Sequence, residues 1–113
     1  LHACELGACK IINIKLGRVG GPTEAIHVHN TCLEKSVPVW CGGMLESGVG
    51  RGCNLALASL PGFTLPGDLS PSARYWERDI VLPAWRMSDD GMVTLPLDRP
   101  GTGIEVDEER IAP

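Results

Sequence analysis

The chain has 113 residues, well short of the roughly 250 residues of a complete (β/α)₈ barrel, so we expect one small unit or a piece of a larger protein. Its net charge of −4 and the lack of any run of Lys or Arg argue against a nucleic-acid partner. No apolar segment reaches the ~20 residues needed to cross a bilayer, and the N-terminus has no signal-peptide pattern, so we expect no membrane partner and a soluble, cytoplasmic protein.

The cysteines favour the same compartment. They number five, are irregularly spaced and lie in apolar surroundings: Cys4, Cys9, Cys32, Cys41 and Cys53. We interpret them as reduced, mostly buried thiols rather than as a disulfide framework. No Cys-x-x-Cys pair occurs, so the sequence gives no support for a zinc knuckle.

The first elements predict the end of a helix, then a strand, then a second helix. Residues 1–10 read as the last turns of a helix without a start signal, which favours a fragment. Residues 9–15 form a short β-branched run that ends in Lys15 and precedes a glycine-rich loop, which is typical of a buried strand. A helix of about three turns follows Pro22, with Thr23 as its N-cap and one apolar side made of Ile26, Cys32 and Leu33.

The pattern then repeats. Residues 37–41 predict a second strand, 42–50 a second glycine-rich loop and 51–60 a second helix, which Pro61 and Gly62 end. Residues 63–68 predict a third strand with its loop. This alternation predicts an α/β fold with a parallel sheet and crossover helices.

The composition of the sequence changes after Ser70. The rest of the chain holds most of the prolines, and the pair Asp90-Gly91 between apolar runs indicates a hairpin. We expect two parts: residues 1–70 as the barrel portion, and residues 71–113 as a tail that packs on the barrel and its capping region.

Active sites of parallel barrels lie where the strands end. Lys15, the loop from Gly42 to Glu46, and Asp68 fall at such ends and would face a common cavity. A lysine that closes a buried strand is costly, because burial disfavours its charged form, so Lys15 is a candidate base. The alternative is a lysine that extends to the barrel rim or pairs with a carboxylate.

Arg18, one turn beyond Lys15, brings a second positive charge that would favour loss of the lysine's proton, unless a carboxylate or solvent neutralises it. Gly42 and Gly43 would let a ligand approach the backbone, although a tight turn explains them equally well.

The other polar residues carry weaker predictions. His27 and His29 lie two apart on a helix, where both cannot reach one ion, so we interpret them as exposed or core-edge histidines. Glu46, Asp68 and Asp79 form no spaced set typical of an oxygen-ligand metal site, so we expect them to act as caps or in loops.

The segments "INIKLGRVGGPTEA" and "VPVWCGGMLESGVGRGCNLALASLPGFTLPGDLS" closely resemble the o-succinylbenzoate synthase and N-acylamino acid racemase family of the enolase superfamily. The resemblance implies a (β/α)₇β barrel with a capping domain. Residues 1–7 would end its fifth helix, and the sixth, seventh and eighth strands would be residues 11–15, 37–41 and 63–65.

The resemblance also implies roles for particular residues. Lys15 matches the sixth-strand lysine, which stabilises the enediolate in the synthase reaction and exchanges a proton on one face of the substrate in racemisation. Glu46 falls where related enzymes carry an acid near the active site. The residues matching the substrate pocket are Gly42, Gly43, Met44, Leu45 and Tyr75.

A divalent ion, usually Mg²⁺, serves these enzymes, and its acidic ligands and the other lysine belong to earlier strands. We therefore expect no metal ligand in this chain, ligands upstream of Leu1, and no activity from the chain alone. The expected partners are a small carboxylate substrate and the N-terminal part of the barrel and capping domain, in a full-length homo-oligomer.

Three functions stay open. The first is o-succinylbenzoate synthase, which dehydrates a cyclohexadiene precursor in menaquinone synthesis, and the second is an N-acylamino acid racemase with the same proton chemistry. The third is a non-catalytic α/β interaction module. Its open strand edges and exposed apolar face would be prone to association.

Overall fold

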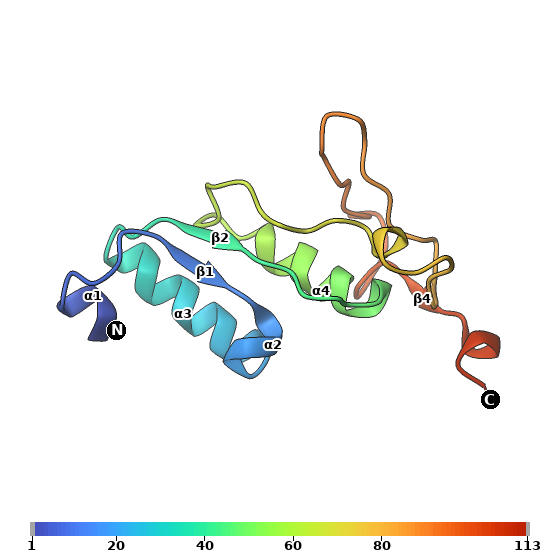
Figure 1. The fold of residues 1–113 in the computed structure, drawn as a ribbon, viewed down its shortest axis with the longest axis horizontal. Coiled ribbons are helices and arrows are strands. Elements are labelled where there is room, and N and C mark those ends of the chain that lie inside the picture. Colours follow the sequence, from blue (N-terminus) through green and yellow to red (C-terminus); the bar gives the residue numbers. More distant parts are fainter. Residues whose placement is uncertain (1, 113) are drawn as a thin grey trace.

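The computed structural model describes residues 2–112. In chain order its elements are α1 (His2–Glu5), β1 (Ile12–Ile14), α2 (Leu16–Val19), α3 (Pro22–Glu34), β2 (Val39–Cys41), α4 (Gly48–Ala58), the 3₁₀ turn η1 (Ser72–Arg74), β3 (Val81–Leu82), β4 (Glu105–Val106) and the 3₁₀ turn η2 (Glu108–Arg110). In Figure 1, α3 and α4 lie along one side of β1 and β2, and the two ends of the chain lie far apart. The α/β arrangement that the sequence predicts is confirmed.

The two central strands are parallel. Ile12 lies opposite Val39, and Ile14 lies opposite Cys41. The crossover between them is α3, as expected for a strand, helix and strand in succession. A core forms where the strands meet the helices, and its buried side chains are Ile14, Leu16, Ala25, Cys32, Val39, Cys41 and Leu57.

The expected third strand at residues 63–65 is wrong. The chain reaches the sheet three residues later, where Asp68 forms a single parallel bridge with Gly42 and its amide donates to the Cys41 carbonyl at 3.0 Å. Pro66 has no backbone N–H to donate to a neighbouring strand. Phe63 instead stacks on His29, with ring centroids 5.2 Å apart.

The buried side of α3 also differs from the predicted one. The helix begins with Pro22 after Gly21, so Thr23 is not its N-cap. Ile26 and Leu33 are 42% and 54% exposed. The buried residues are Ala25, His29 and Cys32, spaced i, i+4 and i+7, which places them on one helical face.

His29 is buried, which corrects its interpretation as an exposed or core-edge residue. Its Nε2 accepts a hydrogen bond from the Gly62 amide at 3.0 Å, and its Nδ1 lies 2.8 Å from the Asn30 Oδ1. The ring is therefore a neutral tautomer with its proton on Nδ1. These contacts tie the loop after α4 to α3.

The helix α4 begins inside the predicted loop, at Gly48. The reason is distant in sequence: the Asp79 carboxylate accepts the Gly48 amide at 2.8 Å, and the Trp85 indole donates to the Gly48 carbonyl at 2.8 Å. A side-chain Cβ at Gly48 would overlap Asp79 and Val81. The tail therefore fixes the start of α4.

The tail packs on α4 through a second core of Leu55, Val81 and Trp85. The hairpin expected at Asp90-Gly91 is present only as a turn, in which the Ser88 amide donates to the Met92 carbonyl at 2.9 Å. Gly91 takes a φ of 82°, which favours glycine. No strands flank this turn, because β3 pairs with β4 instead.

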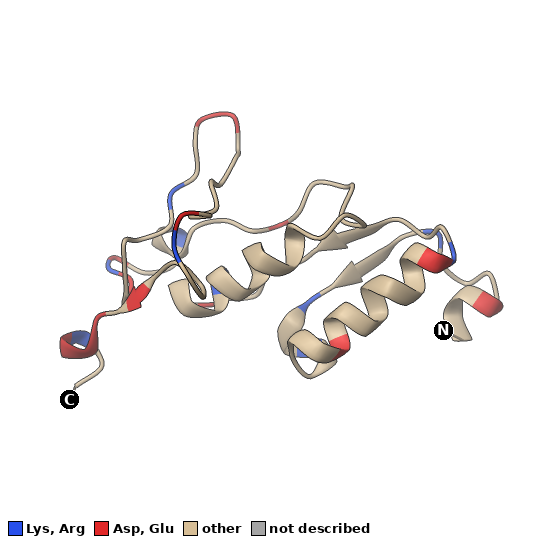
Figure 2. Cartoon of the chain, turned by 180° about the vertical axis from the view of Figure 1, so that it is seen from behind, with Lys and Arg blue, Asp and Glu red and all other residues tan. Residues whose placement is uncertain are grey.

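Charged side chains are spread over the chain. Figure 2 shows acidic residues gathered at η2 and a basic position where β1 meets α2. Within residues 2–112, no helix combines the length and the hydropathy of a membrane span.

Candidate active site at the ends of the parallel strands

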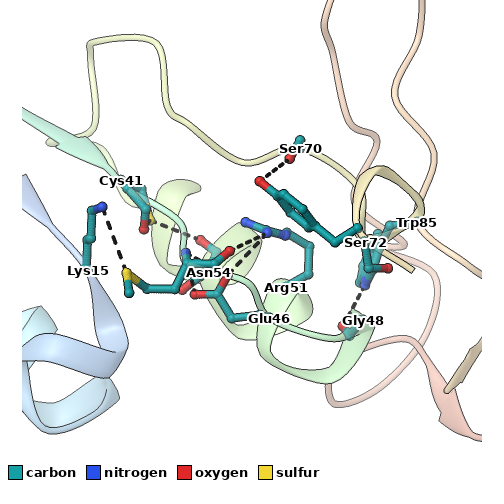
Figure 3. Close-up of polar contacts among 12 residues, drawn as sticks. Lys15, Cys41, Glu46, Gly48, Arg51, Asn54, Ser70, Ser72 and Trp85 are labelled. Carbon is teal, nitrogen blue, oxygen red and sulfur yellow. Dashed lines mark hydrogen bonds and ion pairs between the residues drawn. The ribbon is translucent and has the colours of Figure 1, made fainter. Parts of the chain in front are cut away.

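Lys15 lies at the carboxyl end of β1, in the extended residue that precedes α2. It is half-buried, and its Nζ lies 3.9 Å from the Met44 Sδ in the loop after β2. Figure 3 shows the lysine reaching across toward that loop. The structure therefore brings together two predicted site residues that are distant in sequence.

Gly42 provides the space for Lys15. A Cβ at this position would lie 2.7 Å from the Lys15 Cε and 2.9 Å from its Cγ, and would overlap the Asn13 side chain. Gly42 is not among the glycines with positive φ. The glycine is thus needed for its missing side chain and not for its backbone angle.

Glu46 and Arg51 hold the loop that carries Met44. Both Glu46 carboxylate oxygens accept the Met44 amide, at 2.9 and 2.8 Å. The Arg51 Nη2 donates to the Met44 carbonyl at 3.1 Å and pairs with Glu46 at 3.1 Å. Arg51 is only 1% exposed, so water is kept from the guanidinium end of these contacts, whereas the Met44 amide bonds to Glu46 are exposed.

Two neighbouring groups have shifted pKa values. Burial acts to raise the pKa of Glu46, but the Asn54 amide, the backbone amides and Arg51 outweigh it, so the pKa lies below its usual range and the carboxylate stays charged. Burial raises the pKa of the Cys41 thiol to about 11, with Glu46 adding to the rise and Arg51 opposing it. Cys41 therefore stays a protonated thiol and is no nucleophile at neutral pH.

The cysteines are free thiols in the described part of the chain. Cys32 and Cys41 are buried, whereas Cys4, Cys9 and Cys53 are only partly so. The prediction of mostly buried thiols is therefore met at two of the five positions.

The other predicted site residues make no side-chain hydrogen bond or ion pair to Lys15 among the described residues, although the Arg18 amide donates to the Lys15 carbonyl at 2.9 Å. Arg18 and Leu45 are exposed, and Gly43 is wedged between Arg51 and the Asp68 carbonyl. Tyr75 accepts a hydrogen bond from the Ser70 hydroxyl at 3.3 Å, which ties it to the segment just before the tail. Asp79 caps α4, as expected for an isolated acid.

A cavity of about 390 Å³ lies between the turn after α2 and the Met44 loop, and Gly17, Gly21, Met44, Glu46 and Asn54 are among its lining residues. A second cavity of about 410 Å³ lies between α4 and the tail and includes neither Lys15 nor Met44. Lys15 itself lines neither cavity, but the first is lined by its neighbour Leu16 and by Met44.

A divalent ion finds no ligand set in residues 2–112, where no three His, Cys, Asp or Glu side chains come together. Glu46 is already engaged, since its carboxylate binds the Met44 amide and Arg51. The described residues therefore do not fit a metal ion.

The chain is similar to known enzymes along nearly all of its length. It is 56% identical to the o-succinylbenzoate synthase of Bacillus subtilis, over 96% of the chain and 29% of that relative. It is 52% identical to an N-succinylamino acid racemase of Amycolatopsis, over 90% of the chain and 27% of the relative. The chain thus spans under a third of the length of the curated relatives it matches.

Solved structures of similar fold also cover nearly the whole chain. A crystal structure of an enolase-superfamily member from Enterococcus faecalis matches 97% of the chain with a TM-score of 0.90 and 41% identity, over 29% of that chain. A muconate cycloisomerase variant matches 97% of the chain, over 30% of its own length, with a TM-score of 0.86 but only 22% identity, so it shows the fold alone.

The family described as "Enolase C-terminal domain-like" matches residues 1–110. With the parallel strands, their crossover helix and a lysine at a strand end, this match makes the chain a member of the enolase C-terminal domain-like family of the enolase superfamily.

Proposed function

We propose that the full-length protein carrying this chain is an o-succinylbenzoate synthase, which dehydrates a cyclohexadiene carboxylate through an enediolate in menaquinone synthesis. The observation that carries the proposal is the position of Lys15, at the end of β1 and facing the Met44 loop. Relatives named o-succinylbenzoate synthase are 52% and 56% identical over the segment that contains both elements.

Lys15 supplies a fixed positive charge in this proposal. An ammonium group aimed at the place where negative charge develops stabilises the enediolate without having to reorganise. Gly42 leaves room for the Lys15 side chain to extend. The Met44 thioether restricts the position of the Lys15 ammonium without neutralising its charge. A carboxylate in place of Met44 would pair with the lysine and weaken its effect on the substrate.

A divalent ion such as Mg²⁺ supplies Lewis-acid chemistry to an enediolate reaction when it is bound. Because residues 2–112 hold no ligand set for one, we propose that its ligands, and the second catalytic lysine, come from other residues of the full-length protein.

N-Succinylamino acid racemisation is the second candidate, since a relative of that name is 52% identical. Lys15 would then exchange the α-proton on one face of the substrate. Both activities are to be measured on one preparation of the full-length protein with Mg²⁺. We expect kcat/KM for dehydration to exceed that for racemisation, and the reverse order would make the racemase the better assignment.

Gly42→Ala tests the space around Lys15. The added Cβ displaces Lys15 or Asn13, and a misplacement of about 1 Å costs about 10²-fold in rate. We expect kcat of the full-length protein to fall by roughly that factor, with KM changing much less. Ala56→Ser is the control, because Ala56 is exposed in α4 and lines neither of the two cavities described above, and equal kcat for the two variants would contradict the proposed geometry.

A further inference from the structure

Arg51 is a buried cation that the sequence alone does not connect with catalysis. It lies in α4, is 1% exposed, and its only carboxylate partner within residues 2–112 is Glu46. Its Nε and Nη1 have no hydrogen-bond partner among the described residues. An incompletely bonded buried charge is a poor source of stability, so its contacts call for another explanation.

Those contacts converge on one residue. The Arg51 Nη2 donates to the Met44 carbonyl at 3.1 Å, and the carboxylate that it pairs with accepts the Met44 amide at 2.8 Å. Both backbone polar groups of Met44 are thereby held, one directly and one through Glu46. The Met44 thioether in turn is the group in contact with the Lys15 Nζ.

We propose that Arg51 is a positioning residue for Lys15, which acts by clamping the backbone of Met44 together with Glu46. The inference rests on the proposed function for the role of Lys15, and it adds a residue from a different helix to the site. Figure 3 shows the path from Arg51 through Glu46 toward Lys15.

The shape of the guanidinium fits this task. One terminal nitrogen serves two acceptors, while the other lies 2.5 Å from where a Cβ of Gly43 would be. Gly43 therefore lets the planar group lie flat beneath the loop. A lysine carries its single nitrogen on a flexible stem that is not held in the plane of a guanidinium, so Arg51→Lys should restore the charge and only part of the geometry.

The test uses the full-length protein with four variants. Arg51→Met removes the clamp, Arg51→Lys keeps the charge, and the double variant Glu46→Gln with Arg51→Met leaves no lone buried charge if the single change prevents folding. Arg110→Met is the control, since Arg110 pairs with Asp107 at 2.9 Å in the tail. Each kcat is normalised to folded protein, and KM is measured beside it.

We expect Arg51→Met and the double variant to lower kcat by about 10- to 100-fold with KM within about threefold, as for a misplaced catalytic group. Arg51→Lys should recover part of the loss, and Arg110→Met should leave kcat unchanged. A kcat equal to that of the parent, or a loss matched by Arg110→Met, would overturn the proposal.

A second measurement does not depend on turnover. The rate at which an amine-selective reagent labels Lys15 is followed by mass spectrometry, with exposed Lys10 and Lys35 as internal standards. Loss of the clamp should free Lys15 from Met44 and raise its labelling rate at least about threefold, whereas an unchanged rate would reject the clamp. If the parent protein has no activity, the proposed function is wrong. The labelling rates would still show whether Arg51 positions Lys15.

Discussion

Lys15→Met in the full-length protein should lower kcat for dehydration by about 10²- to 10⁴-fold, the range expected when a group that transfers protons or stabilises charge is removed. Methionine keeps the unbranched apolar stem that passes Gly42. The fold should therefore persist, and the loss should fall on kcat rather than on the melting temperature.

The matched control for this variant is Lys10→Met. Lys10 precedes the same strand at its other end and is exposed, so kcat should stay within about twofold, as for a surface substitution away from the site. A kcat for Lys15→Met within tenfold of the parent value would contradict the assignment of Lys15 as a catalytic residue.

Asp79→Ala should lower the stability of the fold markedly. The Asp79 side chain is 8% exposed and accepts the Gly48 and Ile80 amides and the Ser72 hydroxyl. An unpaired buried donor costs about 1–3 kcal/mol, and both the Gly48 and the Ser72 donors lose this acceptor. We expect the free energy of unfolding to fall by about 3 kcal/mol.

Urea unfolding of the full-length protein measures this loss. Asp89→Ala is the control, because Asp89 is exposed in the same tail and a surface change usually stays within about 0.5 kcal/mol. If both variants unfold at the same midpoint, Asp79 does not cap α4 in the manner described.

Local patterns were enough to predict the two parallel strands and to place Lys15 at the end of the first. A β-branched run ending in a charge, followed by glycines, predicted a strand that closes at Lys15, and the structure ends β1 at Ile14. The second strand was predicted in the same way and is shorter, at Val39–Cys41. Both signals lie within a few residues, where sequence periodicity is informative.

Local sequence patterns could not predict contacts between residues that are far apart in the chain. The start of α4 depends on Asp79, which lies 31 residues away, and His29 is buried because Gly62 and Phe63 return to it. Arg51 reads as an ordinary charged helix residue until the Met44 loop folds over it. The sequence also placed the third strand too early, because a single bridge at Asp68 leaves no run of alternating residues to detect.

The most direct measurement of the central claim is a crystal structure of the full-length protein with Mg²⁺ and bound o-succinylbenzoate. We predict that the Lys15 Nζ lies within about 4–6 Å of the product carbon next to the carboxylate, where negative charge develops in the enediolate, a range over which opposite charges interact strongly. A product bound elsewhere, with Lys15 still directed at Met44 and away from the ligand, would contradict it.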